Sequence, residues 1–306
     1  MRKRYVLIAV LGVCVVGLAA ALLMFLNPGE SQGIHSFTLK DGDTATIQYS
    51  NGNTVDIRYA SINAPGGAQT LGETALIYEK QLIKGAPKIV VDVKPSSEGE
   101  DGNGLYGRKL AYVFLDTGRE VNDNVSVILV SEGFARLDVR NPSDKNIESG
   151  DDFDVRYAEE IINAQIKAAM TRQGCWGLDD TNVGSRVAIA AIRQWSADET
   201  VYIINRGEEA IDFSSGWALR DSDTHELVFS DFPNCLLLPG KVLRVHSGPA
   251  VEAKLGQVLR RDNDGIDLYW RGDHVWNQDK DVATLSDPAG SLVYSYHYPL
   301  TETYWK

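Results

Sequence analysis

Three short pieces decide the fold of the first half of the chain: Asp41-Gly42-Asp43-Thr44, residues 58–67 (RYASINAPGG), and Tyr106-Gly107-Arg108. An aspartate in a turn is a typical ligand of a hard cation. Two guanidinium groups can hold one phosphate through charged, forked hydrogen bonds. The pieces therefore predict a site in which Asp43 faces a cation while Arg58 and Arg108 face a phosphate.

Period-two apolar patterns around these pieces predict short strands, and helical periodicity predicts three helices. The predicted strands are residues 35–40, 45–49, 54–59, 88–93 and 110–115, and the predicted helices are residues 69–84, 121–132 and 154–171. Gly133 stands where the second helix should end. Short strands followed by helices indicate an α+β domain built on a small barrel, over residues 34–177.

Each piece also has a simpler interpretation when it is taken alone. Residues 41–43 fit an ordinary turn with capping carboxylates. Arg58 alternates with Ile57 on a strand and fits either a solvated face or an ion pair with Asp56. Residues 106–108 fit a loop with one exposed charge. Single pieces therefore leave the chemistry open, and only their combination is informative.

In this order and at this spacing, the pieces resemble the thermonuclease (staphylococcal nuclease-like) family, whose fold is an OB-type barrel with helices. The resemblance covers nearly all of residues 34–177. It also rests on Gly72-Glu73-Thr74-Ala75, Leu110-Ala111-Tyr112-Val113, Val121-Asn122, Glu132-Gly133-Phe134-Ala135 and Gly174-Cys175-Trp176. It implies calcium-dependent hydrolysis of phosphodiester bonds in DNA and RNA.

The resemblance further implies roles for single residues. Asp43 matches a calcium ligand, and Arg58 and Arg108 match the two arginines that bind the phosphate and stabilise the transition state. The chemistry is consistent, because the phosphorus centre gathers negative charge that two arginines and a divalent cation oppose.

Two positions depart from the family pattern, which has Asp-Thr/Ala-Pro-Glu where this chain has Asn63-Ala64-Pro65-Gly66. Asn63 replaces a second calcium carboxylate, and its amide oxygen can coordinate but brings no charge. Gly66 replaces the glutamate that orients or deprotonates the attacking water. General-base assistance contributes roughly 10²–10⁴-fold. We therefore expect a weakened calcium site and binding of nucleic acid or other phosphodiesters, with hydrolysis weakened or lost.

Two alternatives stay open. In the first, the protein is an active calcium-dependent endonuclease in which Glu73, or a loop acid such as Glu98 or Asp101, acts as the base. A base must lie within hydrogen-bond reach of its water, and Glu73 follows Gly66 by seven residues. In the second alternative, the protein is a non-catalytic cell-surface module that binds only protein or envelope.

The charge of the chain argues against a non-specific nucleic-acid binder. The net charge is −12 and the isoelectric point is near 4.9. Residues 34–178 carry −6 and residues 179–306 carry −8. Non-specific binders present a basic surface, so a phosphate site here must act locally, through placed arginines. Arg136 and Arg140, which flank Asp138, are expected to form surface ion pairs.

Residues 178–186 form a polar linker, after which short strands separated by Gly, Pro, Asn and Asp indicate an immunoglobulin-like sandwich over residues 187–306. Several segments resemble the lamin-tail domain: 202–207 (YIINRG), 214–219 (SSGWAL), 236–240 (LLLPG), 276–277 (WN) and 283–290 (ATLSDPAG). This domain shows no catalytic set. We expect it to hold an unidentified protein, the cell envelope or the substrate near the first domain.

We expect the histidines of this second domain to be structural or surface residues, and its aromatics to pack in the core or on strand faces. The histidines are His225, His246, His274 and His297, and the aromatics are Trp195, Trp217, Tyr269, Trp270 and Trp276. Cys175 and Cys235 could pair in an oxidising compartment. We favour two separate buried thiols. No cysteine and histidine cluster predicts a zinc site.

Residues 5–26 contain no charged side chain and follow Arg2-Lys3-Arg4. An apolar run of this length can span a bilayer as a helix, and the basic cluster favours a cytoplasmic N-terminus. The alternative is a signal peptide cleaved near residues 19–21. Because the apolar run continues to Leu26, we favour an uncleaved transmembrane anchor, with residues 1–33 as anchor and linker. Both readings place the globular part outside the cytoplasm.

Overall fold

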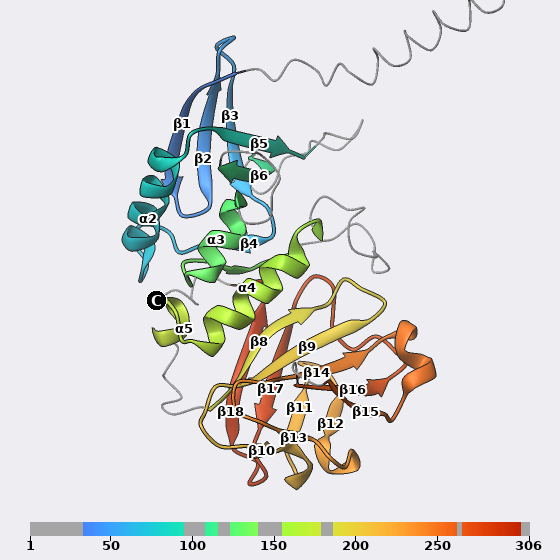
Figure 1. Cartoon of the computed structure of the whole chain (residues 1–306). Coiled ribbons are helices and arrows are strands. Elements are labelled where there is room, and N and C mark those ends of the chain that lie inside the picture. The colour runs from blue at the N-terminus through green and yellow to red at the C-terminus, as the bar shows by residue number, and fades with distance from the viewer. Residues whose placement is uncertain are drawn as a thin grey trace, which may run out of the picture. The chain divides into compact units, whose positions relative to one another are not determined.

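The structure is a computed structural model, and it describes residues 33–94, 108–115, 123–139, 155–178, 186–261 and 265–300 (Figure 1). The predicted membrane segment, Tyr106, Glu98, Asp101 and Arg140 lie outside these ranges. None of the helices in the described ranges is long and apolar enough to cross a membrane. The chain divides into two compact units, residues 1–37 with 47–54 and residues 38–46 with 55–306.

The described part of the smaller unit contains a tight turn. The N–H group of Asn53 donates to Asn51 Oδ1 at 2.9 Å, and Gly52 has a φ of 88°. Ser50 Oγ donates to the carbonyl of Gly33 at 2.8 Å. Only glycine adopts such a φ without strain, so Gly52 suits this turn between two strands.

The first half forms a five-stranded sheet in the order β1-β2-β3-β6-β5, with three helices (Figure 1). The strands are β1 (Ile34–Asp41), β2 (Thr44–Tyr49), β3 (Thr54–Tyr59), β5 (Ile89–Val93) and β6 (Lys109–Leu115), and the helices are α2 (Gly72–Gly85), α3 (Val125–Ser131) and α4 (Ala158–Met170). The predicted elements are confirmed. The helix α3 begins at Val125 because the side chain of Asn124 caps it, accepting from Ser126 N–H at 2.9 Å.

Two strands of two residues each escaped prediction. β4 (Ile62–Asn63) and β7 (Arg136–Leu137) pair antiparallel, with Ile62 opposite Leu137 and Asn63 opposite Arg136. Arg136 is only 2% exposed. The expected surface position is therefore wrong for Arg136, because the short strand β7 lies in the interior.

The second half forms a four-stranded sheet in the order β12-β11-β17-β18 and a five-stranded sheet in the order β15-β16-β14-β9-β8. The strands are β8 (Val187–Arg193), β9 (Glu199–Asn205), β11 (Ala218–Arg220), β12 (Glu226–Val228), β14 (Val242–Ser247), β15 (Val258–Arg261), β16 (Gly265–Arg271), β17 (Asp281–Ser286) and β18 (Leu292–Tyr298), with the small pair β10 (Ile211–Asp212) and β13 (Leu236–Leu237) and a short helix α5 (Cys175–Leu178) before them. The predicted sandwich agrees with these sheets. β15 was missed.

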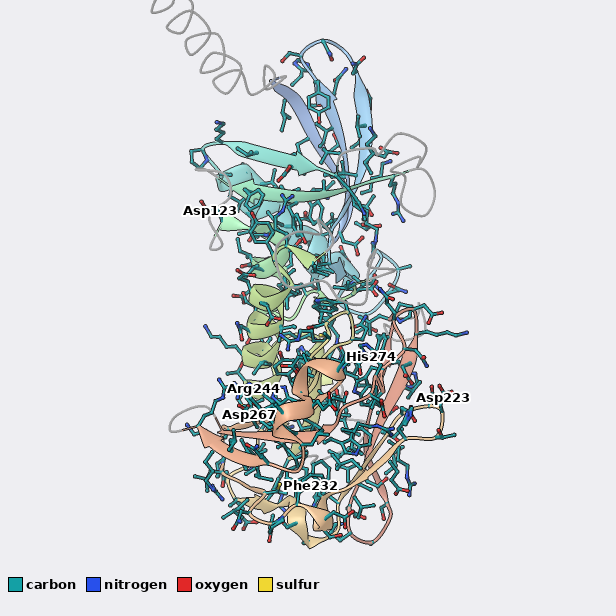
Figure 2. The ribbon with its side chains drawn as sticks, turned by 90° about the vertical axis from the view of Figure 1, so that its right-hand side faces the viewer. Asp123, Asp223, Phe232, Arg244, Asp267 and His274 are labelled. Carbon is teal, nitrogen blue, oxygen red and sulfur yellow. The ribbon has the colours of Figure 1, made fainter. Side chains whose placement is uncertain are left out.

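The expected structural side chains of the second half are mostly in its core. Trp195, Tyr269 and Trp276 are buried, while Trp217 and Trp270 are half-buried. Cys175 and Cys235 are buried free thiols, so they are two separate cysteines. His246 is also buried, with Nδ1 2.7 Å from Asp198 Oδ1 and Nε2 3.6 Å from Asp267 Oδ1. Arg244 lies beside the same Asp267 (Figure 2).

Glu199, at the start of β9, is fully buried and organises one loop. Its carboxylate accepts from Ser247 Oγ at 3.0 Å and contacts His274 Nδ1 at 2.9 Å. It also accepts from the N–H groups of Val275 and Trp276, at 2.7 and 3.2 Å. Figure 2 shows His274 on this loop. A buried carboxylate is tolerated only with such partners, so the loop and β9 depend on each other.

Glu199→Gln should lower the free energy of unfolding by about 2–4 kcal/mol, since an amide NH₂ replaces an oxygen that accepts from buried donors. Urea denaturation measures this. The matched control is Glu226→Gln, whose carboxylate is exposed and paired with Arg220. Its loss should cost under about 1 kcal/mol. Equal costs for the two variants would contradict the role of Glu199.

Candidate phosphate and metal site

Asp43 lies in the turn between β1 and β2 and is 2% exposed. The turn closes because the N–H group of Asp43 donates to Asp41 Oδ1 at 3.2 Å. A Cβ on Gly42 would lie 2.9 Å from the Cβ of Ala64, so only glycine allows this approach. The turn therefore brings Asp43 against the segment that contains Asn63 and Gly66.

Both carboxylate oxygens of Asp43 are occupied by groups of the chain itself. Oδ1 accepts from Thr44 Oγ1 at 3.1 Å and from Arg58 Nη1. Oδ2 accepts from the N–H group of Ala64 at 2.6 Å. Burial raises the pKa of Asp43 above its usual value, while Arg58 beside it acts in the opposite direction.

Arg58, on β3, is held by four oxygen-bearing groups and its side chain is 16% exposed. Besides the ion pair with Asp43, Nη2 donates to the carbonyl of Ile62 at 3.1 Å and to Asn63 Oδ1 at 3.2 Å. Nη2 also lies 3.9 Å from Asp138 Oδ2. The positive charge of Arg58 is thus shared between two carboxylates.

Asp56, the simpler partner considered for Arg58, pairs elsewhere. It binds Lys40 Nζ at 2.7 Å and accepts from Thr46 Oγ1 at 2.6 Å. The structure therefore contradicts both simpler interpretations of Arg58, as a solvated residue and as a partner of Asp56. Side chains two residues apart on a strand point to the same face, so Asp56 and Arg58 share a face of β3. The sequence alone therefore could not show that Arg58 pairs with Asp43 and not with Asp56.

Arg108, the residue before β6, joins the same cluster. Its Nη1 donates to Thr44 Oγ1 at 2.9 Å, and that hydroxyl donates to Asp43. β3 and β6 run parallel with Arg58 opposite Leu110. Asn63 also belongs to the cluster through Arg58. The structure therefore brings together four of the predicted site residues.

Glu73 and Gly66 are not part of this cluster of hydrogen bonds and ion pairs in the described part of the chain. Glu73 is exposed in the first turn of α2, and neither Asp43 nor Arg58 forms a hydrogen bond or ion pair with it in the described part of the chain. The N–H group of Gly66 donates to Gln69 Oε1 at 2.6 Å. A Cβ on Gly66 would meet that same oxygen first, at 3.5 Å, an ordinary contact. Position 66 therefore has room for a side chain.

Calcium does not fit these residues as they are arranged. Calcium takes 6–8 oxygen ligands, whereas both oxygens of Asp43 already face donors and Asn63 Oδ1 faces Arg58. Within the described ranges, no group of three or more His, Cys, Asp or Glu side chains could hold a metal ion. A cation at Asp43 would have to displace Arg58 or the N–H group of Ala64.

A cavity of about 40 Å³ lies beside Arg58. It is lined by Arg58, Tyr59, Ser61, Ile62, Leu110, Asp138 and Val139. Such a volume holds roughly three waters, far less than a nucleotide requires. A phosphodiester bound at this cluster would therefore lie on the surface, beside the exposed part of the arginines.

Glu79 on α2 was not identified from the sequence, and it contacts Tyr59, the residue that follows Arg58 on β3. It is fully buried, and its Oε1 accepts from the hydroxyl of Tyr59. Burial is the main cause that raises the pKa of Glu79 to about 8, and the charge of Asp43 adds to it. The signal was available, because Glu79 follows Ala75 by four residues on the buried helical face.

Glu79 makes the stability of the fold depend on pH. Between the ordinary value of 4.5 and about 8, the folded protein holds a proton on Glu79 that the unfolded chain releases. The free energy of unfolding therefore falls as pH rises through this interval. In Glu79→Gln the fall between pH 5 and 9 should be smaller by a few kcal/mol, on the order given by linkage.

Urea denaturation at a series of pH values measures this difference. Glu73→Gln, on the exposed face of the same helix, is the control and should keep the pH dependence of the parent protein. Identical pH profiles for the two variants would show that Glu79 does not titrate in this range.

This geometry defines a nuclease-like barrel domain joined to a β-sandwich. Residues 56–177 match the family model of the staphylococcal nuclease homologue, and residues 181–299 match that of the Lamin Tail Domain. The chain therefore carries a staphylococcal nuclease homologue domain followed by a lamin tail domain, in the order that the sequence resemblance implied. No curated protein matches the chain. Arg58, Asn63 and Arg108 lie within the match, whereas Asp43 precedes it.

Proposed function

We propose that the nuclease-like domain binds the phosphodiester backbone of DNA or RNA at the cluster of Asp43, Arg58, Asn63 and Arg108, and hydrolyses it slowly or not at all. The family match supports nucleic acid as the ligand class. Gly66 carries the second half of the proposal, because it leaves the cluster without the family's base.

The electrostatics of the cluster support weak binding. A phosphate must compete with Asp43 and Asp138 for Arg58. The chain as a whole is acidic, with a net charge of −12, so no general attraction assists. Binding that depends on two arginines should show a slope of log affinity against log salt of about −1 to −2.

We also propose that residues 5–26 anchor the protein in a membrane with both domains outside the cytoplasm. The support is the uncharged run of residues 5–26 after Arg2-Lys3-Arg4. In this location the lamin tail domain would hold an envelope or protein partner close to the nuclease-like domain.

Arg108→Ala should weaken binding of a fluorescently labelled single-stranded oligonucleotide and reduce the salt slope by about one, since one phosphate contact is lost. Fluorescence anisotropy over a range of salt concentrations measures both quantities. Arg220→Ala is the control, because Arg220 is an exposed arginine of β11 in the other domain. If the two variants bind alike, the arginine cluster is not the binding site.

Restoring both family carboxylates should restore cutting. Gly66→Glu fits the space at position 66, and Asn63→Asp keeps the shape of the side chain beside Arg58. The double variant should cut labelled single-stranded DNA in the presence of calcium about 10²–10⁴-fold faster than the parent protein. Cleavage is followed on gels with calcium and with a chelator.

The control is Gly67→Glu combined with Asn63→Asp, since a Cβ on Gly67 has nothing within 4 Å and places the new carboxylate one residue away. It should stay inactive. Calcium-dependent cutting by the parent at the rate of the double variant would instead establish an active endonuclease, and Glu73→Gln would then test its base. Absence of any oligonucleotide binding would leave the non-catalytic interaction protein.

A further inference from the structure

The short strand β4, which supplies partners to Arg58, and the strand β7 paired with it both contact the lamin tail domain. Ile62 and Asn63 of β4 supply oxygens to Arg58. They pair with Leu137 and Arg136 of β7. Both family domains contribute to the same compact unit, residues 38–46 with 55–306. β4 therefore connects β7 to the groups that orient Arg58.

Arg136 of β7 lies between two aromatic rings from different domains. Its guanidinium carbon is 4.2 Å from the ring centre of Trp176, in the nuclease-like domain, and 4.9 Å from that of Tyr296, on β18. Arg136 is 2% exposed. A guanidinium removed from water is stabilised by aromatic faces, so the lamin tail domain supplies part of the environment that keeps Arg136 inside.

Gln165 of α4 connects the same strand to the same tyrosine. It is fully buried. Its Oε1 accepts from the N–H group of Leu137 at 2.6 Å. Its Nε2 donates to the carbonyl of Ala190 on β8 at 2.6 Å and to the hydroxyl of Tyr296 at 3.3 Å. One side chain thus joins β7 to two strands of the lamin tail domain.

Two further hydrogen bonds join the nuclease-like domain to the lamin tail domain. Gln194 Nε2 donates to the carbonyl of Val139, just after β7, at 3.3 Å. Asn63 Nδ2 donates to the carbonyl of Leu300, just after β18, at 3.5 Å. The side-chain amide of Asn63 therefore contacts Arg58 through its oxygen and the lamin tail domain through its nitrogen.

We infer that Tyr296 is a positioning residue for the phosphate site: its ring and hydroxyl hold β7, and β7 holds the β4 groups that orient Arg58. This inference rests on the proposed function of that site. The competing interpretation is that Tyr296 only fills the core of the lamin tail domain.

Three variants of the full chain separate these interpretations. Tyr296→Leu removes both the ring and the hydroxyl, whereas Tyr296→Phe keeps the ring over Arg136 and loses the hydroxyl near Gln165. Tyr294→Leu is the matched control: Tyr294 is 3% exposed on the same strand and pairs with Leu285 of β17. Circular dichroism establishes conditions under which all three are folded.

Oligonucleotide anisotropy is the first measurement. Tyr296→Leu should bind the labelled single strand about ten-fold more weakly than the parent, a loss typical of one buried cation–π contact. Tyr296→Phe should stay within about three-fold of the parent, and Tyr294→Leu should bind as the parent does. Equal losses in Tyr296→Leu and Tyr294→Leu, or no loss in Tyr296→Leu, would overturn the inference.

Amide hydrogen exchange is the second measurement and does not require any nucleic acid. In Tyr296→Leu, exchange at residues 61–63 and 136–139 should accelerate by about ten-fold or more, because these strands open locally. Tyr294→Leu should leave them unchanged. If the parent binds no oligonucleotide, the proposed function fails, and exchange alone decides whether Tyr296 holds the partners of Arg58. Unchanged exchange in Tyr296→Leu would overturn that role.

Discussion

The ion pair between Asp43 and Arg58 is the interaction on which the geometry of the rest of the cluster depends. A carboxylate that is almost fully buried must have donors on both oxygens, and Asp43 has an arginine, a hydroxyl and a backbone N–H group. The same contacts that make the turn stable take up the oxygens a cation would use. Arg58, in turn, shares its positive charge between Asp43 and Asp138. The buried turn and a cation at Asp43 would therefore compete for the same oxygen atoms.

Asn63 suits a cluster in which Arg58 already faces two carboxylates. Arg58 already faces Asp43 and, at 3.9 Å, Asp138. An aspartate at position 63 would add a third carboxylate around one arginine, which a calcium ion could compensate and an arginine alone could not. Asn63 instead offers a neutral oxygen to Arg58 and a donor to Leu300. In this arrangement Arg58 supplies the positive charge that balances Asp43.

Much of this architecture follows from the sequence, and the exceptions share a physical cause. Period-two patterns located β1, β2, β3, β5 and β6, and the order of the motif pieces grouped Arg58 with Arg108. β4 and β7 have two residues each, too few for any periodicity to register. Arg136 looks like an ordinary surface charge, since the rings that bury it are supplied by segments distant in sequence. Tertiary contacts, and not local pattern, define such residues.

The contact of Arg136 with Tyr296 has a consequence for how this pair of domains can be inherited. The family matches end at residue 177 and resume at residue 181, which suggests modules that could be exchanged at the linker. A lamin tail without an aromatic residue at the position of Tyr296 would leave a guanidinium with one ring and a partly empty wall. Exchange of one domain for a relative's would keep this contact only where the incoming lamin tail carries such a ring, so the two domains are matched to each other across the linker.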